Sequence, residues 1–160
     1  MLLNTSGSTI GIDRRTFKTL LFIILFTVIR VLTAIAFNII SKHISTKSIL
    51  EDLRETENVY TDLRILVILG PMLKTFLFQY IPFKYLLNKC KPALIIMLSS
   101  LLFGIWHFYN PLYILSGICA GLIYNVAYYF KRNSNPFVIT FTIHSLYNLI
   151  AFIINNSKFY

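Results

Sequence analysis

Acidic residues are scarce in this sequence, and none follows Asp62. Only 6 of the 160 residues are Asp or Glu, and all charged residues together make up 13% of the chain. Soluble domains carry about twice that share, so the sequence excludes an ordinary soluble globular domain. After Asp62 the chain therefore lacks both Asp and Glu, two residue types that enzymes commonly use as general bases.

Cysteine is also rare, with Cys90 and Cys119 as the only two. Cys90 lies in a short polar interval and Cys119 lies inside an apolar run, so we expect no disulfide between them. Neither has the spacing of a metal ligand relative to other Cys or His residues. We therefore predict no cofactor and no metal site built on these residues.

Long hydrophobic runs dominate what is present, because 56% of the chain is hydrophobic. A membrane-spanning helix needs about 20 mostly apolar residues. Five runs approach this length, and we predict spans at Thr19–Ile40, Ile65–Pro82, Ala93–Phe108, Leu112–Phe130 and Phe137–Ile154. The predicted fold is therefore an all-α, polytopic transmembrane bundle of about five spans. We divide it into an N-terminal span with a polar loop (1–64) and a membrane core (65–155), and we read Ser41–Arg64 as a loop or short amphipathic helix outside the bilayer.

The net charge of +9 comes from basic residues that mostly flank the apolar runs. This is the membrane pattern, and it favours the lipid bilayer over nucleic acid as the partner. The loops with more Lys and Arg lie on one predicted side, so we expect a multi-pass protein of the cell membrane with a cytoplasmic N-terminus. An alternative at the N-terminus is a signal peptide cleaved near Ala34-Ile35-Ala36.

Five polar residues lie inside the predicted spans, namely Arg30, Lys74, Gln79, His107 and His144. Such residues are costly in hydrocarbon and default to functional candidates. Phe103 and His107 are four apart, as are His144 and Asn148, so each pair shares a helix face. A lone histidine would more simply hold helices together, but two such motifs on separate spans favour a site.

These motifs resemble those of the CAAX-protease and bacteriocin-processing family, also called the CPBP or Abi family. The resemblance rests on Phe103-x-x-x-His107 and His144-x-x-x-Asn148, on the run Ser99-Ser-Leu-Leu-Phe-Gly-Ile-Trp-His107, and on an intervening helix with Gly117 and Gly121. It covers about Ile65 to Ile154. The family resemblance implies intramembrane endopeptidases in which a glutamate activates water while the histidines and asparagine position it. Whether a metal takes part is left open.

The first motif of that family, Glu-Glu-x-x-x-Arg after a proline, is degraded here. The proline frame is present at Pro71, but Lys74 and Thr75 stand where the glutamates would be and Gln79 stands where the arginine would be. Lysine is cationic unless desolvated, and threonine is not a base. The resemblance therefore implies that His107, His144 and Asn148 match catalytic positions but are not catalytic in this chain.

Three functions stay open at this point. The first is a catalytically silent member that binds a peptide or a membrane-protein partner, with bacteriocin immunity or regulation suggested by family analogy. The second is an active, divergent protease, for example one with Lys74 as base and a Ser or Thr nucleophile. The third is a structural membrane subunit whose histidines join helices.

Overall fold

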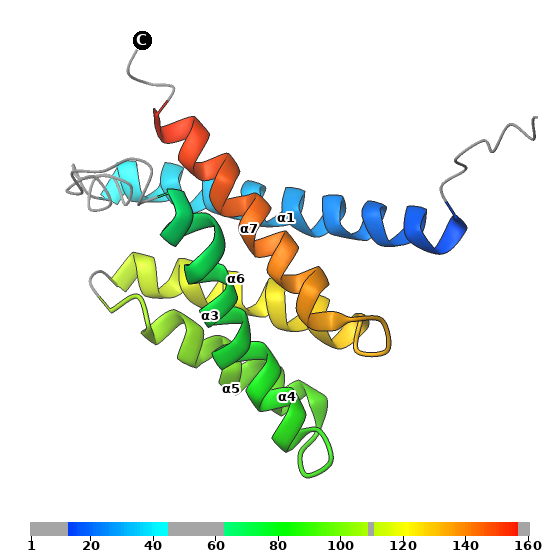
Figure 1. Ribbon diagram of the computed structural model, residues 1–160. Coiled ribbons are helices and arrows are strands. Elements are labelled where there is room, and N and C mark those ends of the chain that lie inside the picture. Colours follow the sequence, from blue (N-terminus) through cyan, green and yellow to red (C-terminus); the bar gives the residue numbers. More distant parts are fainter. Residues whose placement is uncertain (1–12, 45–62, 109–110, 157–160) are drawn as a thin grey trace, which may run out of the picture.

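The computed structural model describes residues 13–44, 63–108 and 111–156, and every regular element in these ranges is helical. Figure 1 shows the helices crossing one another in a single bundle, with α1 along one side and α7 lying across it. The prediction of an all-α membrane bundle is confirmed. The elements are α1 (Arg14–Ile44), η2 (Ile65–Leu69), α3 (Gly70–Thr75), η3 (Phe76–Tyr80), α4 (Ile81–Leu86), α5 (Pro92–Ile105), α6 (Pro111–Phe130) and α7 (Pro136–Asn156).

Four helices in the described ranges are long and apolar enough to cross a membrane: Arg14–His43, Ile65–Leu86, Pro111–Phe130 and Pro136–Asn155. The span expected over Ala93–Phe108 is shorter than predicted, because α5 has 14 residues and ends at Ile105. There the backbone N–H of His107 donates to the Gly104 carbonyl at 2.9 Å, which tightens the turn and stops the helix.

The first helix is longer than the sequence suggested. The polar stretch was expected to begin at Ser41, but α1 continues to Ile44, with Ser41 buried against the bundle. A polar residue can extend a helix where its face meets other helices, and α1 packs on both α6 and α7. Residues 45–62 of that stretch lie outside the described residues, whereas Leu63 and Arg64 at its end are helical. The predicted division at residue 64 stays a prediction.

Residues 65–86 form one continuous helix that twice widens into a π-helical turn. In the first, the N–H of Gly70 donates to the Ile65 carbonyl. In the second, the N–H of Ile81 donates to the Phe76 carbonyl. A proline follows each donor directly, and proline has no N–H and clashes with the carbonyl of the preceding turn. The wider turns accommodate both prolines without ending the helix.

Helices α5 and α6 approach more closely than side chains would allow. A Cβ atom added at Gly117 would lie 2.9 Å from the Gly104 Cα, and one added at Gly121 would lie 2.9 Å from the Ser100 Cα. Small residues that permit such backbone contact are typical of helix pairs in membranes. Across the same interface, the Asn125 amide donates to the Ser100 hydroxyl at 3.1 Å.

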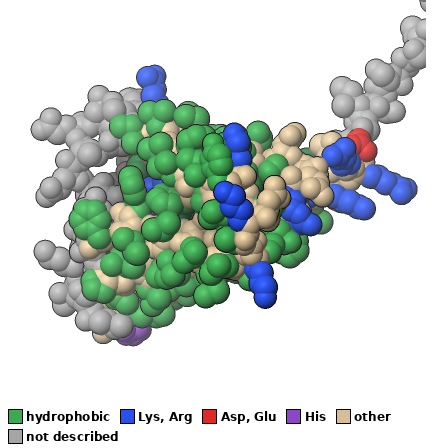
Figure 2. All heavy atoms as spheres, turned by 90° about the horizontal axis from the view of Figure 1, so that it is seen from below, with side chains coloured by type: hydrophobic (Ala, Val, Ile, Leu, Met, Phe, Trp, Pro, Cys, Tyr) green, Lys and Arg blue, Asp and Glu red, His purple; other side chains and the backbone are tan. Residues whose placement is uncertain are grey.

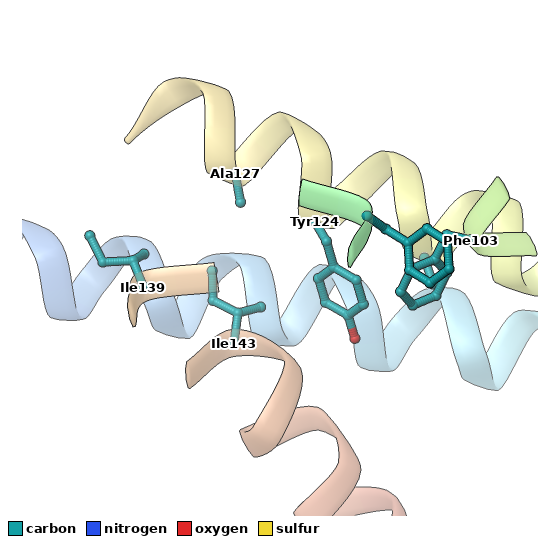
Figure 3. Close-up of a cluster of buried hydrophobic side chains, with 7 residues drawn as sticks. Phe103, Tyr124, Ala127, Ile139 and Ile143 are labelled. Atoms are coloured by element: carbon teal, nitrogen blue, oxygen red, sulfur yellow. The ribbon is translucent and has the colours of Figure 1, made fainter. Parts of the chain in front are cut away.

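The apolar core lies where α5, α6, α7 and the 65–86 helix meet. Its buried members are Phe78, Phe103, Ala120, Tyr124, Ala127, Ile139 and Ile143. Figure 3 shows Phe103 close to Tyr124, whose ring extends from α6 toward α1 and α7. Phe103 contacts both His107 and His144, and Tyr124 stacks on His144, so this part of the core lies against the predicted site residues.

Basic side chains gather on one side of the molecule, the side from which the N-terminal end of α1 extends (Figure 2). The Lys131 ammonium lies 4.5 Å from the centre of the Phe22 ring, which brings the α6–α7 turn beside the N-terminal half of α1. Apolar side chains cover most of the rest of the visible face. This arrangement agrees with the predicted grouping of the loops, while the cytoplasmic orientation stays a prediction.

Candidate functional site

Lys74 and His107 meet in the described structure. Lys74 comes from α3, and His107 lies just beyond the end of α5. The His107 Nδ1 lies 2.9 Å from the Phe103 carbonyl, which can only accept, so Nδ1 carries the proton. The neutral ring then has its Nε2 lone pair free to accept from the Lys74 ammonium, 3.2 Å away.

His144 has a different environment. It is 4% exposed, and its Nδ1 has no hydrogen-bond partner in the described structure. Its ring stacks on Tyr124 with a centroid distance of 4.4 Å. His144 is therefore held by aromatic packing on α6, whereas His107 is half-buried and hydrogen-bonded.

The Phe103 ring brings the two histidines together. Its centroid lies 5.5 Å from that of His107 and 5.8 Å from that of His144. The Lys74 ammonium lies 5.9 Å from the same ring. The four-residue spacing of Phe103 and His107 is what places both side chains on the inner face of the α5 end. Three of the predicted site residues, Lys74, His107 and His144, thus surround the Phe103 ring.

Asn148 makes a contact that the sequence did not predict. Its Nδ2 donates to the Leu66 carbonyl at 2.6 Å. That carbonyl needs a partner because the N–H of Gly70 is donated to Ile65 and Pro71 has no N–H. An unpaired carbonyl is costly in a membrane interior. Asn148 therefore joins α7 to the widened turn of the 65–86 helix.

The remaining residues of the degraded motif are fully buried. Thr75 and Gln79 both have 0% exposure. The Thr75 hydroxyl and both polar atoms of the Gln79 amide have no hydrogen-bond partner in the described structure. Thr75 follows Lys74 by about 100° around the helix. It lies in the bundle interior, while Lys74 reaches His107.

Two tyrosines that the sequence did not single out, Tyr124 and Tyr147, contact polar residues of the predicted spans. The Arg30 guanidinium lies 3.9 Å from the centre of the Tyr147 ring, and Tyr124 stacks on His144. Within the described residues, Arg30 contacts an aromatic face rather than a carboxylate. The available signal was the spacing of Gly117, Gly121 and Tyr124, which marks the inner face of α6.

The contact between Lys74 and His107 affects whether either side chain can act as a general base. A general base needs a free lone pair within reach of water. The Nε2 lone pair of His107 is used by Lys74, and a lysine ammonium has none. No group of three His, Cys, Asp or Glu residues that could hold a metal occurs within the described ranges.

Comparison with known proteins assigns the chain to a family. No curated protein and no solved structure matches the chain. Residues 56–150 match the family described as type II CAAX prenyl endopeptidase Rce1-like. The matched segment covers more than half of the 160 residues and contains the Lys74, His107 and His144 positions. Together with its apolar helices, this shows that the chain is a membrane protein and that it belongs to the Rce1-like CAAX endopeptidase family.

Proposed function

We propose that this chain is a catalytically silent member of its family that binds a peptide or a membrane-protein partner. One observation carries the proposal. The Lys74 ammonium, at the position matched to a family glutamate, donates to the His107 Nε2 over 3.2 Å. A cation therefore stands where the resembled mechanism needs a proton acceptor.

The same contact alters the role of His107. Its two ring nitrogens are engaged by the Phe103 carbonyl and by Lys74, so neither can accept a proton from water without breaking a contact. No acidic residue follows Asp62 in the sequence. These facts support the absence of hydrolysis in the proposed function.

The close packing of α5 and α6 places His107 beside Lys74, and the proposal takes this region as the binding site. The close α5–α6 contact at Gly117 leaves room for the His107 ring, since an added Cβ there would lie 3.0 Å from its Nδ1. A partner held in this frame without being cleaved suits bacteriocin immunity or the regulation of another membrane protein. Both of these roles come from analogy with the family.

The test is turnover of a peptide substrate by the purified protein in lipid nanodiscs, compared with its His144→Ala variant. We expect no product from either protein. Product formed by the unmodified protein and abolished in His144→Ala would show that the chain is an active, divergent protease. Product formed equally by both would indicate a contaminating protease.

A structural subunit is the second candidate, and the Asn148 contact favours it. The Asn148 amide binds the Leu66 carbonyl at 2.6 Å, so one matched motif residue already serves helix packing. If this is the whole function, His107→Gln should leave the fold intact and the unmodified protein should bind no peptide. Peptide binding that His107→Gln weakens would favour the first candidate.

A further inference from the structure

Three segments that are distant in the sequence bring basic side chains to one side of the bundle. They are the start of α1, the region where α4 turns into α5, and the turn between α6 and α7, which Figure 1 shows on the same side. Together they contain Arg14, Arg15, Lys18, Lys84, Lys89, Lys91, Lys131 and Arg132. Figure 2 shows basic side chains gathered there. This side of the molecule therefore has a large excess of positive charge.

Two of these segments meet at an aromatic ring of α1. Lys131 directly follows α6, and its ammonium lies 4.5 Å from the centre of the Phe22 ring. Phe22 packs against the apolar core and stacks on Phe26 with a centroid distance of 4.4 Å. Lys131 is half-buried in this position. The contact therefore holds the Lys131 ammonium beside α1.

Lys18 lies on the same face of α1 as Phe22. It comes four residues earlier, which places it one turn away, about 6 Å along the helix axis. Arg15 comes seven residues before Phe22 and continues the same stripe of the helix. Lys18 and Arg15 are both exposed. The start of α1 and the α6–α7 turn thus direct cations toward one region.

The described residues supply no counter-charge for Lys18 and Lys131. In residues 13–44, 63–108 and 111–156, the only acidic residue is Asp13. Its carboxylate caps α1, with Oδ1 3.2 Å from the backbone nitrogen of Arg15. Two ammonium groups about one turn apart repel each other. An anion bound between them would replace that repulsion with two attractive contacts.

The depth of this pair in the membrane indicates where the anion comes from. Helix α6 has 20 residues, which extend about 30 Å, the thickness of the hydrocarbon core. Lys131 is the first residue after this helix, and Lys18 directly precedes the apolar run expected to begin at Thr19. Both ammonium groups are therefore expected at the level of the lipid headgroups. Basic pockets between membrane helices at this level recognise anionic headgroups.

We propose that Lys18 and Lys131 bind the phosphate of an anionic phospholipid, whose headgroup bridges the start of α1 and the α6–α7 turn. Arg15 adds positive charge from the same face of α1. Leu21 and Leu25 follow Lys18 and Phe22 by three residues and are exposed, so acyl chains have an apolar surface beside the headgroup. The bound lipid links α1 to the rest of the bundle. This site is independent of the proposed function.

The test is native mass spectrometry of the purified protein in detergent micelles, titrated with phosphatidylglycerol or with phosphatidylcholine of the same acyl chains. We expect the first phosphatidylglycerol to bind about tenfold more tightly than the first phosphatidylcholine, because it lacks the cationic choline group. Equal affinities for the two lipids would overturn the proposal.

Two double variants with the same change of charge separate a site from a diffuse attraction. Lys18→Gln with Lys131→Gln should reduce the affinity for phosphatidylglycerol to that for phosphatidylcholine. Lys89→Gln with Lys91→Gln removes two exposed cations of the α4–α5 turn and should keep the preference within about threefold. An equal loss in both double variants would show a diffuse attraction and would overturn the proposal.

A conservative variant and a competitor complete the test. Lys18→Arg with Lys131→Arg keeps both charges and should retain the preference, and its loss would contradict recognition by charge. Circular dichroism of each variant shows whether the helices remain folded. Excess inorganic phosphate should not displace phosphatidylglycerol, since the acyl chains contribute to binding. Displacement that depends on Lys18 and Lys131 would mean that the site binds free phosphate, and the lipid proposal would fail.

Discussion

The α5–α6 pair and the 65–86 helix differ in how closely and how regularly their backbones pack. In α5–α6 the backbones touch through glycines, and the Asn125 amide nitrogen donates to the Ser100 hydroxyl across the interface, while the Asn125 Oδ1 has no partner in the described structure. The 65–86 helix has two prolines and two widened turns, and it carries buried polar atoms without partners at Thr75 and Gln79. The first region, which we call the frame, consists of the closely packed helices α5 and α6. The second is an irregular helix that contains the altered motif, Lys74, Thr75 and Gln79.

The largest effect is expected from disturbing the frame. A Cβ added at Gly104 would lie 2.8 Å from both the Ile114 carbonyl oxygen and the Ile118 nitrogen. Gly104→Ala should therefore destabilise the protein by about 1–3 kcal/mol through overpacking, despite the better helix propensity of alanine. Unfolding in detergent, followed by circular dichroism, measures this change.

Leu102→Ala is the matched control on the same helix. Leu102 is 56% exposed, so its truncation removes surface rather than core contacts. We expect a clearly smaller loss of stability than for Gly104→Ala. Equal stabilities of Gly104→Ala and the unmodified protein would mean that the two helices are not in backbone contact.

The second effect concerns the link between Asn148 and the widened turn. Asn148→Leu should cost about 1–3 kcal/mol, because it leaves the Leu66 carbonyl without a partner. Pro71→Ala returns an N–H to the position that can serve this carbonyl. The penalty of Asn148→Leu should therefore be smaller when Pro71→Ala is also present.

A double-mutant cycle of these two changes measures the coupling directly. If their effects on the free energy of unfolding simply add, the proline is not the reason for the Asn148 contact.

The third prediction sharpens the contrast between frame and altered motif. Lys74→Met removes a half-buried cation that has no described carboxylate partner. Replacing such a charge by an apolar residue is often neutral or stabilising, so we expect a change in unfolding free energy of less than about 1 kcal/mol. A loss as large as that of Gly104→Ala would make Lys74 part of the frame.

The fourth prediction concerns variants that should leave stability unaffected, and it tests the predicted orientation of the chain in the membrane. The predicted orientation places Asn133 in the cytoplasm and Ser48 outside. Membrane-impermeant thiol reagents should label Ser48→Cys in intact cells and should not label Asn133→Cys, with Cys90 and Cys119 first replaced by Ser. The reverse pattern would contradict the orientation.

Much of the fold and part of the site could be predicted from the sequence. Long apolar runs leave little alternative to membrane helices, because backbone groups in lipid must be paired within the segment. The four-residue spacing of Phe103 and His107 correctly indicated a shared inner face. Placing Lys74 at a family glutamate position anticipated a cation near the imidazoles, and the structure has it 3.2 Å from His107.

Other features depend on contacts between distant segments. The partner of Asn148 follows from which carbonyl the Gly70-Pro71 pair leaves free, and that depends on the widened turn. The stacking of Arg30 on Tyr147 requires the packing of α1 against α7. Hydrophobicity also continues past Ile105, so composition alone did not reveal the early end of α5.

The short α5 makes the surrounding bilayer part of the site. Its 14 residues extend about 21 Å, whereas the hydrocarbon core is about 30 Å thick. His107 follows the end of this helix, and we expect the bilayer to be thinner where it meets this end. Access to Lys74 and His107 should therefore vary with acyl-chain length, easier in thin membranes and harder in thick ones. The lipid composition of the cell thus becomes a means of adjusting this protein.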